Sequence, residues 1–223
     1  MAEYRQTIYT APEGAADLLL VRHGESAPAR PGAVLPLKDG HGDPALFGNG
    51  PAQAEAVGQR LAGAGVQAIY VTKLQRTHQT AAPLAAATGL SPAEDPDLHE
   101  VSLGDWDGGL YRIKAAERDP VYVKMLEMQD WGVIPGAEPR EAFLTRVRRG
   151  ITRIAAAHQG ERAAVVVHGG VIGAALHLAT GSAPFAFLGA ANGSISRLVI
   201  EGDHWSVRAF NDTSHLNGIG GDY

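Results

Sequence analysis

Two arginines and two histidines follow short apolar stretches of the chain: Arg22, His23, Arg76 and His168. The planar guanidinium of an arginine can bind two oxygen atoms of a phosphate at once. A neutral imidazole can attack phosphorus, and nearby arginine charges disfavour the protonated imidazolium. If the four side chains converge, they form a strongly electropositive pocket for a phosphoryl group, with His23 as the candidate nucleophile.

Two further residues complete this candidate site. Gly169 follows His168 at the start of an expected helix, where backbone N–H groups are directed towards an anion. The alcohol that leaves a phosphate ester needs a proton from a general acid. Glu100, in "DLHEVSLGDWDG", is the best candidate for that acid. Because Glu100 must start protonated, we expect activity to be highest on the acid side of neutrality.

Short apolar runs are expected to position these side chains, because each run ends directly or a few residues before one of them. Buried strands are predicted over 17–21, 66–71 and 163–168. Helices are predicted from Pro51, over 74–89 with a kink or break at Pro83, over about 111–129, about 139–158, and 169–181. Residues 194–211 are predicted to form two strands around a Gly-Asp turn. This alternation predicts an α/β fold, a three-layer α/β/α sandwich with a mostly parallel central sheet and a C-terminal hairpin.

The remaining segments are predicted to be an arm, a loop and a cap. Residues 1–16 are expected to be a flexible N-terminal arm, and 17–223 a single catalytic domain with an inserted helical cap around 105–137. Residues 30–50 are rich in Pro and Gly and are expected to be a long loop. Some apolar side chains of the cap can line a substrate site, although core packing is the more common role: Trp106, Tyr111, Tyr122, Met125, Met128 and Trp131. Its basic residues can bind a second anionic group or lie on a solvated helix face: Arg112, Lys114, Arg118 and Lys124.

The composition limits the other possibilities. The formal net charge is -5 over 223 residues, so no overall basic field exists for nucleic acid or an anionic membrane. The chain has no cysteine, which excludes disulfides, thiolate zinc sites and thiol nucleophiles. Several histidines have spacings that match no familiar metal-ligand pattern: His78, His99, His177 and His215. We therefore expect a cytoplasmic protein without metal or cofactor, which acts on a small phosphorylated substrate. The oligomeric state stays open, since either an apolar edge or the helix predicted within 111–131 could support a homodimer.

With these motifs the chain resembles the histidine phosphatase superfamily, in its phosphoglycerate mutase-like branch. The matching pieces occur in the family's order and span nearly the whole chain: "LLLVRHGES", "GNGPAQAEAVGQRL", "YVTKLQRTHQTA", "LHEVSLGDWDG", "PGAEP", "VVVHGGVI" and "FNDTSHL". The resemblance implies that His23 is transiently phosphorylated and that Glu100 is the proton donor. It also implies that the phosphate is bound by Arg22, Arg76, His168 and the amide of Gly169, with no metal or organic cofactor.

Three positions near the site bear on this resemblance. Ala29 stands where many members have an asparagine, which removes one possible phosphate donor. Ser26 stands where serine or threonine is usual. Lys73 replaces a small residue or proline and would add a cation at the pocket rim. We expect Ser26 and Lys73 to take part in substrate binding.

Three functions remain open, and hydrolysis is favoured. The leading hypothesis is a phosphoric monoester hydrolase of the histidine acid phosphatase type, which works through a phosphohistidine. A mutase is the alternative, although the cofactor-dependent mutases have Arg-His-Tyr directly after the acid, where this chain has Val101, Ser102 and Leu103. A non-catalytic module that binds a phosphorylated ligand or a protein is the third possibility, and the retained charged set argues against it.

Overall fold

Six strands form one central sheet in the computed structural model, which describes residues 3–219. In their order across the sheet they are β5 (Ala93–Glu94), β4 (Val66–Val71), β6 (Arg162–Val167), β1 (Ala16–Arg22), β7 (Ile195–Glu201) and β8 (His204–Asp212). The first four strands are parallel, whereas β7 and β8 pair antiparallel. The predicted mostly parallel sheet and C-terminal hairpin are therefore confirmed.

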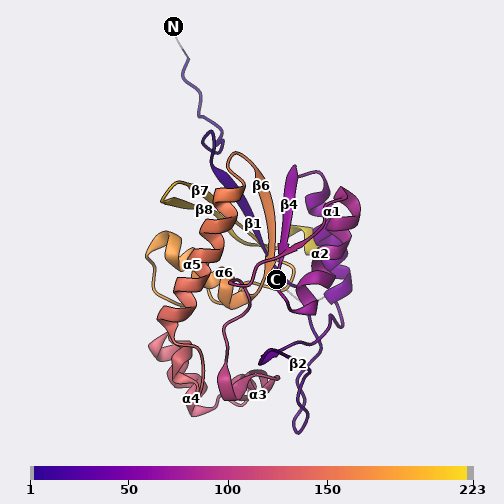
Figure 1. Cartoon of the computed structure of the whole chain (residues 1–223), viewed down its shortest axis with the longest axis vertical. Helices are drawn as coiled ribbons and strands as arrows, with labels where there is room; N and C mark the ends of the chain where they lie inside the picture. The colour runs from indigo at the N-terminus through magenta and orange to yellow at the C-terminus, as the bar shows by residue number, and fades with distance from the viewer. Residues whose placement is uncertain (1–2, 220–223) are drawn as a thin grey trace.

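Helices cover both faces of this sheet, as Figure 1 shows. They are α1 (Gly50–Ala62), α2 (Gln75–Thr88), α3 (Leu110–Ala116), α4 (Pro120–Met128), α5 (Arg140–Ala157) and α6 (Gly169–Thr180). The helices α1 and α2 pack together on one face, and α5 and α6 pack on the other, which confirms the three-layer sandwich. The helices α3 and α4 lie beyond the end of the sheet where β1 and β6 finish (Figure 1). No helix among residues 3–219 is long and apolar enough to cross a membrane.

Each central strand contributes side chains to two separate cores. On β1, Leu18 and Leu20 belong to the core beneath α5 and α6, whereas Leu19 and Val21 belong to the core beneath α1 and α2. Successive side chains of a strand point to opposite faces, so a strand between two helical layers must be apolar at every position. This requirement explains the uninterrupted apolar run that was predicted to be a buried strand.

Polar contacts fix the end of β1 that lies away from α3 and α4. Asp17 accepts hydrogen bonds from Nε and Nη2 of Arg162 at 2.9 and 2.6 Å. It accepts two more from Nε and Nη2 of Arg197, both at 2.8 Å. Burial alone would raise the pKa of Asp17, but the hydrogen bonds from Arg197 and Arg162 outweigh it and lower that pKa. The carboxylate is therefore ionised and paired on β1.

The single helix predicted over 111–129 is wrong, because the structure divides this segment into α3 and α4. Arg118 adopts a left-handed backbone conformation, with φ of 52°, between the two helices. Asp119 then caps α4, where its carboxylate accepts the N–H of Val121 at 2.8 Å. Pro120 has no N–H and cannot continue a helix from the preceding turn, but it suits the first position of a new one.

Smaller differences concern one loop and one helix. Within the loop predicted over 30–50, the two-residue strands β2 (Leu37–Lys38) and β3 (His41–Gly42) pair in a short hairpin. The helix α2 continues through Pro83 without a break. Short 3-10 turns complete the chain: η1 (Gly104–Trp106), η2 (Trp131–Val133) and η3 (Ser214–Leu216).

Candidate active site

The ends of β1 and β6 bring His23 and His168 together. Because the two strands are adjacent and parallel, residues that follow them emerge at the same edge of the sheet. The two imidazole rings meet edge to face, with centroids 5.2 Å apart. Arg76, from the first turn of α2, donates its Nε–H to His23 Nε2 at 3.1 Å and an Nη2–H to His168 Nδ1 at 3.3 Å. Three of the predicted residues are thus in direct contact.

Hydrogen-bond partners assign the tautomers of both rings. His23 Nδ1 lies 2.7 Å from the carbonyl oxygen of Gly24, so this nitrogen carries the proton and donates it. His23 Nε2 therefore has a free electron pair, which accepts the Arg76 N–H. His168 accepts from Arg76 at Nδ1, so Nε2 carries its proton and donates to Thr72 Oγ1 at 3.0 Å. The ring nitrogen of His23 that has the free electron pair is therefore Nε2, and it faces the guanidinium.

Burial and positive charge keep both imidazoles neutral. Burial is the main cause, and the charges of Arg76 and Arg22 add to it, so that the pKa of His23 lies well below its usual value near 6.5. The pKa of His168 is lowered in the same way, by burial and then by Arg76. Burial also lowers the pKa of Arg76 to about 10, which still leaves the guanidinium charged at neutral pH.

The main chain around the nucleophile is fixed from two sides. The N–H of His23 donates to the carbonyl of Val167 at 3.0 Å, and its carbonyl accepts from Asn192 Nδ2 at 2.9 Å. The role of Asn192 had no signal in the sequence. Gly24 is required by a close approach, since a Cβ built on it would lie 2.6 Å from the carbonyl oxygen of Gly50. The imidazole of His23 therefore rests on a backbone that contacts β6, α1 and the loop before β7.

Arg22 and Gly169 lie on the β1–β6 side of the site. Arg22 donates an Nη1–H to the carbonyl of Ala190 at 2.5 Å. Gly169 begins α6 directly against this side chain: a Cβ built on the glycine would lie 3.5 Å from Arg22 Nε. The structure thus brings both residues to the same edge as His23 and His168.

Glu100 reaches the start of α6 from the opposite side. Its carboxylate accepts the N–H of Gly170 at 3.2 Å through Oε2 and the N–H of Val101 at 3.0 Å through Oε1. A Cβ built on Gly170 would lie only 2.5 Å from Glu100 Oε1. Gly170 is a site residue that the sequence reasoning missed, although the doubled glycine after His168 was a usable signal.

A cavity of about 230 Å³ opens above these residues. Arg22, His23, Arg76 and Glu100 line its polar side. Aromatic residues of the segment 105–137 line the other side: Trp106, Tyr111 and Trp131. These three side chains also pack in the core, so they both line the cavity and contribute to core packing. Met125 is fully buried in the core, whereas Met128 is exposed.

The basic residues of the same segment lie in different places. Arg112 lines the cavity and donates to Ser26 Oγ at 2.9 Å and to the carbonyl of Ala27 at 2.7 Å. Lys114 forms an ion pair with Asp119 instead. Ser26 is therefore buried behind Arg112 and contacts the site through that side chain.

The loop over 30–50 also contributes to the site. Leu35, His41 and Gly42 line the cavity, and the carbonyl of Gly42 accepts an Nη1–H from Arg76 at 2.8 Å. Lys73 is not among the residues that line this cavity, since its ammonium pairs with Asp39 at 3.1 Å. Ala29 lies beside Gly109, because a Cβ built on that glycine would lie 3.0 Å from Ala29 Cβ.

Comparisons with known proteins place the chain in a family. A family model described as the histidine phosphatase superfamily (branch 1) matches residues 18–213. The chain is 32% identical over 218 residues to phosphoglycerate mutase-like protein 4 of Arabidopsis thaliana, a match that covers 93% of each chain. It is also 32% identical to the metal-independent phosphoserine phosphatase of Arabidopsis thaliana, over 92% of this chain and 84% of that protein. The solved structure of mycobacterial glucosyl-3-phosphoglycerate phosphatase superposes with a TM-score of 0.73 at 26% identity, over 89% of this chain and 100% of that chain.

Proposed function

The chain belongs to branch 1 of the histidine phosphatase superfamily, and from this premise we propose that it hydrolyses phosphate monoesters through a phosphohistidine on His23. The observation that carries the proposal is the contact of His23 Nε2 with Arg76 Nε at 3.1 Å. It joins a neutral, buried nucleophile to a guanidinium that suits the oxygen atoms of a phosphoryl group.

In the first step the substrate's phosphoryl group enters the cavity beside His23, Arg22 and Arg76. Its oxygen atoms are better acceptors than a neutral imidazole, so the N–H groups of Arg76 turn to them and release the electron pair on His23 Nε2. That electron pair attacks phosphorus, and the bond to the leaving oxygen breaks. Glu100 gives its proton to the leaving oxygen. The phosphoryl charge is stabilised by Arg22, Arg76 and the amide of Gly169. His168 contributes by accepting an N–H of Arg76 at Nδ1, which orients the guanidinium.

In the second step water replaces the departed alcohol. The Glu100 carboxylate takes a proton from the water molecule, whose oxygen attacks phosphorus. The bond between phosphorus and Nε2 breaks, its electrons return to the imidazole, and inorganic phosphate leaves. The cycle restores a protonated Glu100 and a neutral His23.

The segment 105–137 is proposed to act as a cap that contacts the alcohol portion of a small substrate. Three of its aromatic side chains face the cavity together with the guanidinium of Arg112. Of the three residues directly after Glu100, Val101 and Leu103 line the cavity, and neither carries a charge that could hold a substrate during re-phosphorylation. This apolar lining favours hydrolysis over the mutase reaction.

A trapping experiment tests the nucleophile. The purified protein is mixed with a radiolabelled phosphate ester, denatured at once, and digested to locate the label. We expect label on His23 and none in a His23→Ala variant. Label on another residue, or no label in an enzyme that turns over, would show that the nucleophile assignment is wrong.

A product analysis separates hydrolase from mutase. With 3-phosphoglycerate as substrate, we expect inorganic phosphate to accumulate. Formation of an isomerised ester without inorganic phosphate would favour the mutase. A well-folded sample that is inactive on sugar phosphates, nucleotides, phosphoglycerates and phosphopeptides would favour a non-catalytic binding module.

A further inference from the structure

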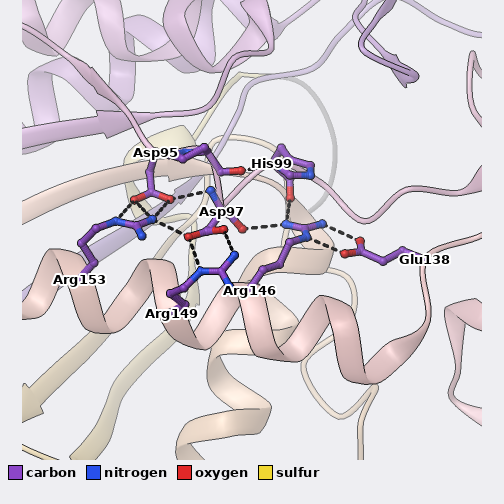
Figure 2. Close-up of polar contacts among 8 residues, drawn as sticks. Asp95, Asp97, His99, Glu138, Arg146, Arg149 and Arg153 are labelled. Atoms are coloured by element: carbon purple, nitrogen blue, oxygen red, sulfur yellow. Dashed lines mark hydrogen bonds and ion pairs between the residues drawn. The ribbon is translucent and has the colours of Figure 1, made fainter.

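Arg146 lies on α5, inside the protein, and each of its five N–H groups has an acceptor. Only 8% of the residue is exposed. Figure 2 shows the guanidinium between Glu138 and the chain segment that leads to Glu100. Nε and Nη2 donate to the two carboxylate oxygens of Glu138, both at 2.7 Å. The other donors go to backbone carbonyls of the segment: Asp97 at 2.8 Å, His99 at 2.7 Å and Glu100 at 3.0 Å.

A second set of contacts holds the chain on the other side of Glu100. The backbone N–H of Glu138 donates to the carbonyl of Ser102 at 2.9 Å. The N–H of Ser102 lies 3.4 Å from Glu138 Oε2. Arg146 and Glu138 therefore hold the main chain before and after Glu100 through one ion pair.

Burial of the ion pair between Arg146 and Glu138 costs free energy, so the two side chains must keep a precise geometry. Burial raises the pKa of Glu138, but the hydrogen bond and charge of Arg146 outweigh it and lower that pKa. A buried ion pair stabilises a protein only when all donors and acceptors are satisfied, and the removal of one partner leaves an uncompensated charge. Since the donors of Arg146 point to three carbonyls of one short segment, the guanidinium determines the path of that segment.

Two neighbouring arginines on α5 provide a comparison within the same network (Figure 2). Arg149 and Arg153 bind the carboxylates of Asp97 and Asp95, which precede Glu100 in the chain. Their side chains are 60% and 45% exposed, against 9% for Arg146. They hold the beginning of the segment, whereas Arg146 holds the residue that carries the acid.

We propose that Arg146 and Glu138 are positioning residues for proton transfer by Glu100. The proposal rests on the function proposed above, in which Glu100 protonates the leaving oxygen. A displaced main chain at Glu100 moves its carboxyl group away from that oxygen, while His23, Arg76 and His168 keep their mutual contacts. The loss therefore falls on the protonation of the leaving group and spares phosphoryl binding.

The test compares leaving groups in an Arg146→Lys variant, which keeps the charge but loses the planar fork. An alkyl alcohol is a poor leaving group and needs the general acid, whereas p-nitrophenolate leaves without one. We expect kcat/KM on an alkyl phosphate to fall by about 10- to 100-fold, less than the full contribution of a general acid, because the acid is displaced and not removed. We expect kcat/KM on p-nitrophenyl phosphate to change by less than about threefold, because p-nitrophenolate leaves without a general acid. The second step, in which Glu100 is the base, comes after the leaving group has departed and does not enter kcat/KM.

Three reference proteins make the result decisive. Arg149→Lys, on the same helix and network, is expected to leave both rates unchanged. Glu100→Gln is expected to show the same selective loss as Arg146→Lys, and the double variant no additional loss on the alkyl ester. Equal loss on both substrates in Arg146→Lys, with the selective loss retained in Glu100→Gln, would overturn the positioning role alone.

Other outcomes separate the proposals further. If Glu100→Gln loses both rates equally, the acid role of Glu100 is wrong, and the positioning role is wrong with it. If the wild-type protein hydrolyses neither ester, the proposed function is wrong. Should Arg146→Lys fail to fold in a thermal unfolding assay, Glu138→Gln replaces it, since this variant keeps the shape and an acceptor oxygen. The same selective loss is then expected, and its absence would overturn the positioning role.

Discussion

His23 and Glu100 face the same cavity but are held by different kinds of interaction. His23 and His168 end two parallel strands whose side chains lie in dry apolar cores. Glu100 belongs to an irregular segment held by α5: Arg146 binds the carbonyl of Glu100 itself, whereas Arg149 and Arg153 bind carboxylates at the beginning of the segment (Figure 2). The position of His23 thus depends on backbone hydrogen bonds and apolar packing, whereas the position of Glu100 depends on charge. The two halves of the site should respond differently to substitution and to pH.

The largest expected effect concerns the strand-end half. His23→Ala removes the nucleophile, and we expect kcat on p-nitrophenyl phosphate to fall by at least about 10⁴-fold, as for other nucleophile deletions. Steady-state kinetics on the purified variant measures it. His78→Ala is the matched control, because His78 is a surface histidine paired with Glu94, and it should keep full activity. Comparable activity in His23→Ala would show that the chemistry lies elsewhere.

A smaller effect is expected when the guanidinium between the histidines is changed. Arg76→Lys keeps the charge but loses the fork that contacts both rings. We expect kcat to fall by about 10²- to 10³-fold on alkyl and p-nitrophenyl phosphates alike, because phosphoryl stabilisation is needed with either leaving group. Arg60→Lys, at a more exposed position, is the control. A loss confined to the alkyl ester would instead place Arg76 with the acid half.

The acid half can be disturbed without touching a charge. In Gly170→Ala the new Cβ would lie 2.5 Å from Glu100 Oε1, so the carboxylate must move. We expect kcat/KM on an alkyl phosphate to fall by about 10- to 100-fold and kcat/KM on p-nitrophenyl phosphate to fall much less. Gly63→Ala is the control, since no other group lies within 4 Å of its added Cβ. Unchanged alkyl phosphate hydrolysis in Gly170→Ala would show that the contact between Gly170 and the Glu100 carboxylate is not needed for proton transfer.

The smallest expected effect is on stability as the pH falls. His23 and His168 have folded-state pKa values well below 6.5, so below that pH the unfolded chain binds protons that the folded chain does not. Each imidazole therefore lowers the free energy of unfolding by about 1.4 kcal/mol at one pH unit below its unfolded pKa. The hydrogen bonding of Arg149 is the main reason that the pKa of Asp97 is lowered to about 2, and burial opposes it. The stability that the ionised Asp97 contributes is therefore lost only as the pH falls below 3.8.

Urea unfolding at several pH values measures these two windows. The wild-type protein should lose stability between pH 7.5 and 5.5, and a His23→Gln variant should show a shallower slope. A loss of stability that begins only below pH 4, with no difference in His23→Gln, would show that the buried histidines do not cause the loss expected between pH 7.5 and 5.5.

The strand-end half could be predicted largely from the sequence, because its elements are specified locally. The apolar runs before Arg22 and His168 predict buried strands, and parallel strands deliver the residues after them to one edge. The structure places His23, Arg76 and His168 in contact at that edge. The division of the predicted helix at Asp119 and Pro120 also had a sequence signal, namely a capping residue before proline, which the helical periodicity concealed.

The support of Glu100 could not be predicted in this way. Arg146 lies beside the buried Phe143 and Val147 on α5, but an arginine in an amphipathic helix is usually solvated. Its burial depends on Glu138 and on carbonyls of residues about 46 to 49 positions earlier, which only the folded chain brings near. Backbone acceptors carry no residue-type signal, so a buried cation that binds them is not evident from composition or spacing.

The contact of Asp17 with Arg162 and Arg197 has a consequence for strand registration. A shift of β1 by one residue would exchange Leu18 and Leu20 with Leu19 and Val21, so the two cores barely distinguish the alternatives. The same shift would draw the buried Asp17 carboxylate away from both guanidiniums, at the high cost of an unpaired charge. The alignment of His23 with the end of β6 is thus set at the far end of the sheet, a full strand length from the chemistry it serves.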